Sequence, residues 1–154
     1  MDTNRLPNYP RLMPELFQRL VAQSADIKAT TLGKGLVALV DLRVSQINGC
    51  AYCVDMHARE LLAADGGDLQ RLNSVSTWRE VPFYTERERA ALQWAESLTR
   101  MGETHAPRED FDALQPHFSE REIAELTMAV AVINAWNRIA GGLRAPVARR
   151  PLAA

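Results

Sequence analysis

The two cysteines of this chain, Cys50 and Cys53, are the residues best suited to do chemistry. They lie three positions apart, and His57 follows the second cysteine by four positions. In a helix, these separations place both thiols and the imidazole on one face. A thiolate is a nucleophile, and a neighbouring imidazole can take up its proton. The spacing therefore predicts thiol–disulfide or peroxide chemistry at these three residues.

The position of the pair in the chain favours the same chemistry. Asn48 or Gly49 is the expected break between two helices, which places both cysteines in the first turn of the second helix. Unpaired backbone N–H groups and the helix dipole favour the thiolate form of a cysteine there. If one thiol is oxidised to a sulfenic acid, the other can attack it and close a disulfide, which prevents further oxidation. A C-x-x-C pair thus supplies a nucleophile, a resolving thiol and a reducible product.

Three other interpretations of the cysteine pair are a buried structural role, zinc binding and haem attachment. Two free cysteines can be buried structural residues. A C-x-x-C pair is also half of a common zinc site, with His57 as a third ligand, but the remaining histidines, His105 and His117, lie far along the chain. Haem attachment requires a histidine directly after the second cysteine, where Val54 stands. Redox chemistry is the prediction, with a metal-binding structural protein as an alternative.

Length and charge narrow the class of protein. A chain of 154 residues fits one domain, residues 1–154, with a hydrophobic core. Its 18 basic and 19 acidic residues nearly cancel, so there is no electrostatic basis for binding nucleic acid or a membrane surface. No segment has the length of a transmembrane helix, and the polar start is unlike a signal peptide. We expect a cytoplasmic protein without a cofactor, because C-x-x-C is typical of catalysis in reducing compartments.

The elements that position the pair are predicted to be helices. Apolar residues recur at helical spacing over 15–23, 35–48 and 50–64, with Gly49 between the last two. Capping boxes at Thr85–Glu88 and Ser119–Glu122 begin two further helices. These helices are expected to end near residues 101 and 139. Shorter helices are expected over 69–76 and 107–115, with a loop over 78–83.

The overall pattern favours an all-helical fold. No strand pattern is present, nor the β-α-β alternation that a thioredoxin fold requires. We expect about six to eight helices, an irregular N-terminal arm over residues 1–13 and a basic tail over residues 144–154. The run 123–139 is apolar nearly all round, which marks a helix buried in the fold or in a subunit contact.

Polar residues interrupt that apolar run and need partners if they are buried. Asn134, Asn137 and Arg138 either line the active site or lock a subunit contact. Glu125 is either a carboxylate near the thiols or half of a buried ion pair, and the buried ion pair is the favoured interpretation.

The stretch Leu42-Arg-Val-Ser-Gln-Ile-Asn-Gly-Cys-Ala-Tyr-Cys-Val-Asp-Met-His57 closely resembles a known signature. It is that of the AhpD-like alkylhydroperoxidases of the carboxymuconolactone decarboxylase superfamily. Segments 78–80, 83–92 and 133–138 also resemble the small single-domain members, so the resemblance covers roughly residues 10 to 145. It implies an all-α fold that assembles into homo-oligomers, trimers or hexamers. It also implies antioxidant reduction of hydroperoxides, with a dithiol or a thiol protein as reductant.

The resemblance also implies a role for each site residue. Cys53 would be the peroxidatic thiol that becomes a sulfenic acid. Cys50 would be the more exposed resolving thiol, which also meets the external reductant, and His57 would relay protons. The branch that contains the lactone decarboxylases lacks the cysteine pair, so the pair argues against decarboxylation in this chain.

One position departs from the family pattern. The family's proton relay begins with a glutamate twelve residues before the first cysteine, where this chain has Ala38. Asp41 lies roughly 60° round the same helix and is the nearest substitute, but we expect it to be a solvated surface carboxylate. Tyr52 stands where well-studied members carry a histidine. We therefore expect a slow or narrow peroxidase, with disulfide exchange or redox sensing as the alternative function.

Overall fold

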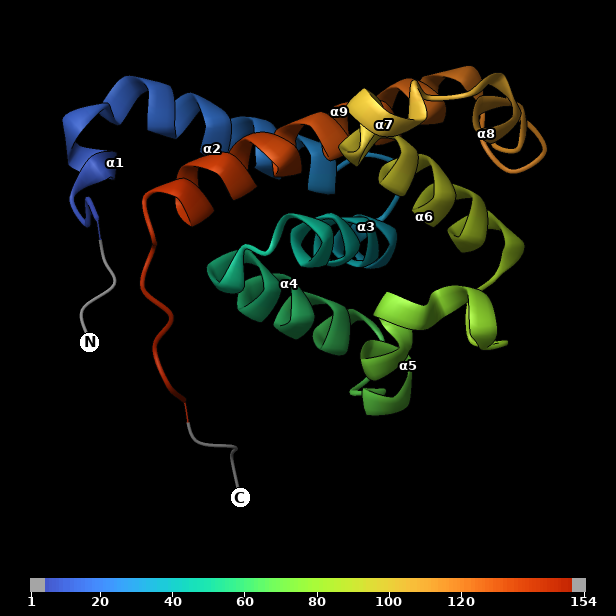
Figure 1. Ribbon diagram of the computed structural model, residues 1–154, viewed down its shortest axis with the longest axis horizontal. Coiled ribbons are helices and arrows are strands. Elements are labelled where there is room, and N and C mark those ends of the chain that lie inside the picture. Colours follow the sequence, from blue (N-terminus) through green and yellow to red (C-terminus); the bar gives the residue numbers. More distant parts are fainter. Residues whose placement is uncertain (1–4, 151–154) are drawn as a thin grey trace.

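The computed structural model describes residues 5–150, which form helices joined by loops and contain no strand (Figure 1). The all-α prediction is confirmed. This part of the chain has nine α-helices, one more than the expected range allows. The sequence pattern missed the single-turn helices α1 and α7, which are too short for an apolar period to reveal. The helices are α1 (Tyr9–Leu12), α2 (Pro14–Lys28), α3 (Lys34–Asn48), α4 (Ala51–Ala64), α5 (Leu69–Ser74), α6 (Glu86–Thr99), α7 (Met101–Thr104), α8 (Arg108–Asp112) and α9 (Glu120–Trp136), with a 3₁₀ segment η1 (Val75–Glu80) and a π-helical turn η2 (Asn137–Gly141).

Local capping explains where several of these helices begin. Both predicted capping boxes are present, at the first residues of α6 and α9. In each box the serine or threonine side chain accepts from the backbone N–H of the glutamate three residues later, and that glutamate accepts from the cap residue's own N–H. The loop expected over 78–83 is partly wrong, because Val75–Glu80 forms a 3₁₀ segment that buries Trp78.

Helix α3 lies at the centre of the fold. Every residue from Leu36 to Leu42 is buried, because α4, α6 and α9 pack around this helix. Figure 1 shows α3 nearly end-on, with α4 on one side and α9 and α2 on the other. Within the chain, α9 buries one side, while Met128 on its other side is 47% exposed. Burial of the run 123–139 in the middle of the fold is therefore only partly confirmed, and its burial in a subunit contact stays a prediction.

A sharp turn between α3 and α4 places the cysteine pair. Gly49 ends α3 with φ of 67°, in the left-handed region that glycine adopts without steric cost. Cys50 is then the N-cap of α4, and its Sγ accepts from the backbone N–H of Cys53 at 3.4 Å. The predicted break at Gly49 is confirmed, and it brings both sulfur atoms to the N-terminal end of α4.

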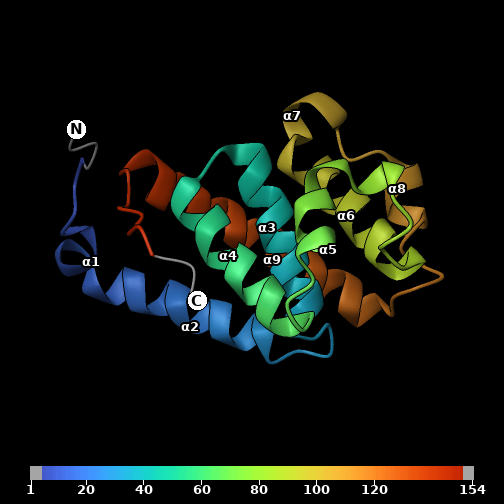
Figure 2. The ribbon, with the colours of Figure 1, turned by 90° about the horizontal axis from the view of Figure 1, so that it is seen from below.

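The two ends of the described chain meet at one end of the molecule. The backbone N–H of Arg5 donates to the carbonyl oxygen of Leu143 at 3.2 Å, and both views place these segments side by side (Figures 1 and 2). The expected irregular arm over residues 1–13 is partly wrong, because it contains α1. Residues 1–4 of the arm and 151–154 of the basic tail lie outside the described residues.

Candidate active site around the cysteine pair

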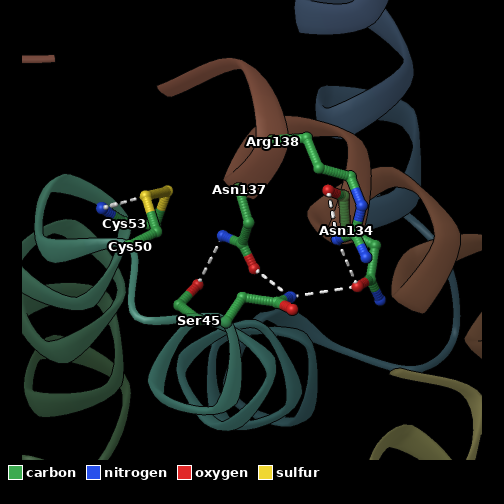
Figure 3. Close-up of a disulfide and its surroundings, with 7 residues drawn as sticks. Ser45, Cys50, Cys53, Asn134, Asn137 and Arg138 are labelled. Carbon is green, nitrogen blue, oxygen red and sulfur yellow. Dashed lines mark hydrogen bonds between the residues drawn. A yellow bond between two sulfur atoms is a disulfide. The ribbon is translucent and has the colours of Figure 1, made fainter. Parts of the chain in front are cut away.

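Cys50 and Cys53 form a disulfide at the start of α4, with their Cα atoms 5.3 Å apart (Figure 3). Each cysteine is only 1% exposed. The expectation that Cys50 is the more exposed of the two is therefore wrong. The physical reason is that Ala140 of η2 and Ala145 from the segment that follows pack against the pair. Solvent can therefore reach each sulfur only past the residues that pack around it.

Cys53 and His57, one turn apart on α4, both line a cavity of about 370 Å³. Most of the other lining residues are apolar and come from α2, α4 and α9. One wall is aromatic: the ring of Phe17 lies 5.9 Å from that of Tyr9 and 5.5 Å from that of Trp136, both edge-on. The sequence motif therefore faces a space suited to a small apolar molecule.

His57 is buried, and its two ring nitrogens have different surroundings. Nδ1 lies 2.8 Å from Oε2 of Glu60, one turn further along α4. Nε2 is buried and finds no hydrogen-bond partner among the described residues. A carboxylate at Nδ1 favours the tautomer that carries its proton there, which leaves the lone pair on Nε2. Nε2 is thus the ring nitrogen whose lone pair is available to accept a proton.

Glu60 is held as an anion by two donors. Its Oε1 lies 2.5 Å from Nζ of Lys28 on α2, and its Oε2 accepts from His57. The hydrogen bond from His57, with a smaller contribution from Lys28, lowers the pKa of Glu60 to about 2. An ionised carboxylate here orients the imidazole through the hydrogen bond at Nδ1. Sequence reasoning missed Glu60, although its spacing of three from His57 was a usable signal.

Asp41 is buried, so the expectation of a solvated surface carboxylate is wrong. It is 7% exposed, lines the same cavity, and places Oδ2 3.7 Å from Nδ1 of His57. Burial raises the pKa of Asp41 to about 7, and the charges of His57 and Lys28 only partly oppose this. The prediction from the position of Asp41 around its own helix failed because other helices cover α3 on all sides near this residue. Ala38, one turn earlier, is a buried core residue.

The burial of Asp41 gives a prediction about stability and pH. Its folded pKa of about 7 exceeds the ordinary 3.8, so between these values the folded state binds the extra proton and stability falls as pH rises. The full shift corresponds to about 4 kcal/mol as an upper bound, and we expect roughly 2–4 kcal/mol. Asp41→Asn should therefore remove this loss: urea unfolding of the oxidised protein at pH 4 and pH 8 should differ less in the variant than in wild type. An equal difference in both proteins would contradict the buried, proton-binding carboxyl.

A network of amides fastens η2 to α3 beside the disulfide (Figure 3). Asn48 Nδ2 donates to Oδ1 of Asn134 at 3.0 Å and to Oδ1 of Asn137 at 2.8 Å. Asn137 Nδ2 donates to Oγ of Ser45 at 3.0 Å, and Arg138 donates to Oδ1 of Asn134 at 2.8 Å. None of these three residues is among those that line the cavity, and their predicted role in a subunit contact stays a prediction.

Three other predictions concern a metal site, the partner of Glu125 and a membrane-spanning helix. Among them, no group of three or more His, Cys, Asp or Glu side chains is arranged to hold a metal ion. Glu125 accepts from Nε of Arg121 at 2.8 Å, which confirms an ion pair, but the pair is not buried, because the Arg121 side chain is 83% exposed. Within residues 5–150, none of the helices has the length and apolar character needed to cross a bilayer.

Several known proteins are similar to this chain in sequence, in fold or in both. The chain is 31% identical to the uncharacterized protein YdfG of Bacillus subtilis over 132 residues, which is 86% of this chain and 89% of YdfG. It is 44% identical to ATU0492 of Agrobacterium tumefaciens, a protein of unknown function proposed to be the antioxidant defence protein AhpD; that crystal structure superposes with a TM-score of 0.87 over 95% of this chain and 100% of that one. The debrominase Bmp8 shares the fold alone, at 22% identity and a TM-score of 0.78 over 88% of this chain and 72% of that chain.

The sequence also matches a family as a whole. The model of the carboxymuconolactone decarboxylase family covers residues 14–97, which include α2, α3, α4 and the cysteine pair. This match spans more than half of the chain, and it agrees with the structural likeness to a proposed AhpD. The chain is therefore an AhpD-like member of the carboxymuconolactone decarboxylase family.

Proposed function

We propose that this chain is a thiol peroxidase that reduces organic hydroperoxides through Cys53 and Cys50, as part of antioxidant defence. One observation carries the proposal: Cys53 and a buried imidazole with a free nitrogen face the same apolar cavity, and Cys53 is disulfide-bonded to Cys50. Family membership makes an enzymatic role plausible for the chain, and the likeness to a proposed antioxidant AhpD supports this kind of enzyme.

The proposed cycle begins from the reduced pair. The Cys53 thiol gives its proton to Nε2 of His57, and the thiolate attacks the terminal oxygen of the hydroperoxide. The O–O bond breaks, Cys53 becomes a sulfenic acid, and the departing alkoxide takes the proton back from His57 to leave as an alcohol. The Cys50 sulfur then attacks the Cys53 sulfur, and the hydroxyl leaves as water with the Cys50 proton. The two thiols have supplied two electrons and become the observed disulfide.

A reductant must then restore the two thiols. We propose an external dithiol or a thiol protein, because each turnover leaves an intramolecular disulfide that only thiol exchange or an equivalent two-electron donor can open. A reducing compartment such as the cytoplasm meets this need. The proposed cycle uses no cofactor, since side chains of this chain carry the peroxide step and the external thiol carries the reduction step.

The cavity lining supports an organic substrate over hydrogen peroxide. Burying an apolar substituent contributes roughly 25 cal/mol per Å², which hydrogen peroxide cannot supply. With dithiothreitol as reductant, purified protein should consume cumene hydroperoxide with a kcat/KM at least about tenfold above that for hydrogen peroxide, since each 1.4 kcal/mol gives a factor of ten. Consumption no faster than with dithiothreitol alone would contradict the proposed function.

Phe17 in the aromatic wall provides a variant for testing this preference. Phe17→Ala removes a ring that lines the cavity while leaving the cysteines and His57 untouched. We expect kcat/KM for cumene hydroperoxide to fall about three- to tenfold, with little change for hydrogen peroxide, because only the larger substrate contacts the wall. Hydrogen peroxide is the internal control for damage to the fold. Equal losses for both substrates would place Phe17 outside the substrate site.

Disulfide exchange or redox sensing with weak peroxidase activity is the second candidate. It is favoured by Ala38, a buried residue that stands where the resemblance places a relay glutamate. The same assay separates the two functions. A protein that exchanges its disulfide with thiols but leaves cumene hydroperoxide untouched would be a redox partner and not a peroxidase.

We also propose that the chain assembles into a homo-oligomer, a trimer or hexamer. Large apolar side chains are exposed on α2 and on the outer side of α9, including Leu16, Val21 and Met128. Burial of such residues between copies would stabilise an assembly. Light scattering that gives the mass of one chain would contradict this proposal.

A further inference from the structure

The segment that follows α9 covers the sulfur of Cys50. Ala140 and Ala145 pack against the cysteine pair. A Cβ placed on Gly141 would lie 3.7 Å from Cβ and 3.9 Å from Sγ of Cys50. Cys53 borders the cavity, whereas Cys50 is not among the described residues that line it. The two sulfurs therefore face different surroundings: Cys53 faces an open space and Cys50 faces residues 140–145.

Residues 140–145 are attached firmly at one end and weakly at the other. The amide network around Asn137 fixes the start of η2 to α3. Further on, the backbone N–H of Ala145 donates to the carbonyl oxygen of Ala140 at 2.8 Å. The N-terminal arm then adds two hydrogen bonds: Arg5 donates from its backbone N–H to Leu143 O at 3.2 Å and from Nη1 to Gly142 O at 3.1 Å.

Local conformation also favours opening at this end. Arg144 has φ of 57°, a left-handed conformation that is unfavourable for a residue other than glycine. Gly142 and Arg144 are exposed, so few apolar contacts hold this part of the segment. Segments with few buried contacts and exposed hydrogen bonds open locally at low free-energy cost.

The chemistry of reduction requires access to one sulfur. A thiolate attacks a disulfide sulfur directly, so the attacking atom must reach van der Waals contact with it. A small thiol can enter the cavity and reach Cys53, but a thiol carried on a protein surface cannot enter a space of about 370 Å³. A reductant that attacks Cys50 instead must first displace residues 140–145.

We propose that residues 140–145 form a lid that opens to admit an external dithiol to Sγ of Cys50, with Arg5 as its latch. The attacking thiolate bonds to the Cys50 sulfur, the Cys50–Cys53 bond breaks, and Cys53 leaves as a thiolate that takes up a proton. The second thiol of the reductant then attacks its own partner sulfur and releases Cys50. The reductant leaves as a disulfide, having donated two electrons. The inference deepens the proposed function by locating the reductant's entry.

Two variants alter the lid in opposite directions. Arg5→Ala removes the side-chain hydrogen bond to Gly142, and we expect the disulfide to be reduced about three- to tenfold faster. Gly141→Ala adds a methyl group in van der Waals contact with Cys50 and restricts the open chain, and we expect reduction about two- to fivefold slower. Arg11→Ala is the matched control, because it removes an exposed arginine of the same arm, on α1.

The experiment follows reduction of the oxidised full-length proteins by reduced thioredoxin, a dithiol protein that is too large to enter the cavity. Samples are quenched with an alkylating reagent, and the alkylated Cys50 and Cys53 thiols are counted by mass at each time. Repeating the series in 1 M urea separates local from global opening, because a local opening exposes little surface and responds weakly to denaturant. The lid predicts the two opposite changes in rate, a control equal to wild type, and a weak response to urea.

Other outcomes would overturn the lid. Equal rates in all four proteins would mean that the protein reductant reaches the disulfide without displacing residues 140–145. An equal acceleration in Arg11→Ala, or rates that follow global unfolding in urea, would equally remove the latch role of Arg5. Because no peroxide is used, a protein without peroxidase activity can still pass this test, and an active peroxidase can still fail it.

Discussion

Replacing Cys53 with serine should lower kcat/KM for cumene hydroperoxide by at least about 10³-fold, because a hydroxyl cannot form an anion comparable to a thiolate near neutral pH. The reduced variant, mixed with peroxide in stopped flow, should show no fast consumption. Cys53 is the sulfur that lines the cavity, one turn before His57.

Cys50→Ser is the matched control for this experiment. It keeps the nucleophile at the cavity and removes only the resolving thiol, so one equivalent of peroxide per chain should still be consumed quickly. The product should be a sulfenic acid on Cys53, which a dimedone-type reagent traps. Fast consumption by Cys53→Ser together with its loss in Cys50→Ser would reverse the roles of the two cysteines.

Removing the imidazole should have the second largest effect. His57→Ala should lower kcat/KM by about 10²- to 10⁴-fold, the range typical for loss of a positioned general base. Nε2 of His57 is the buried nitrogen without a hydrogen-bond partner among the described residues, and the ionised Glu60 holds the opposite side of the ring. The cavity left by the alanine should admit free imidazole, and partial rescue by imidazole would be expected.

Glu60→Gln tests how the imidazole is held. The amide oxygen can still accept from Nδ1, but the anion that pairs with Lys28 is lost. We expect a smaller loss of kcat/KM, about tenfold, because the ring is held less firmly while its Nε2 is unchanged. For the His57→Ala variant of the preceding prediction, a kcat/KM within about threefold of the wild-type value would contradict the assignment of His57 as the general base.

Short sequence patterns predicted where many of the helices begin and end, because interactions between neighbouring residues determine these positions. Gly49 had to end a helix, since its left-handed φ suits glycine, and the two capping boxes marked the first residues of α6 and α9. The C-x-x-C spacing pointed to Cys53 and His57, which line one cavity. These features depend on residues within one or two turns of each other, where sequence spacing and spatial distance coincide.

Features that depend on distant segments were mispredicted or missed. Asp41 was expected in solvent because its helix face was judged from α3 alone, yet α3 is enclosed on all sides. Cys50 was expected to be exposed, but a turn about ninety residues later in the chain covers it. Lys28, at the end of α2, gave no signal, since only the folded chain brings it to Glu60. Tertiary packing determines these contacts, and the packing of distant segments cannot be inferred from a single sequence.

The account depends on electron transfer from the cysteine pair at the start of α4 to a peroxide in the adjacent cavity. The most direct measurement is the intact mass of fully reduced protein before and after one equivalent of cumene hydroperoxide, quenched by alkylation and followed by peptide mapping. We expect a loss of two hydrogens, confined to the peptide that contains Cys50 and Cys53. Unchanged thiols, or oxygen added only to methionines elsewhere, would contradict the account.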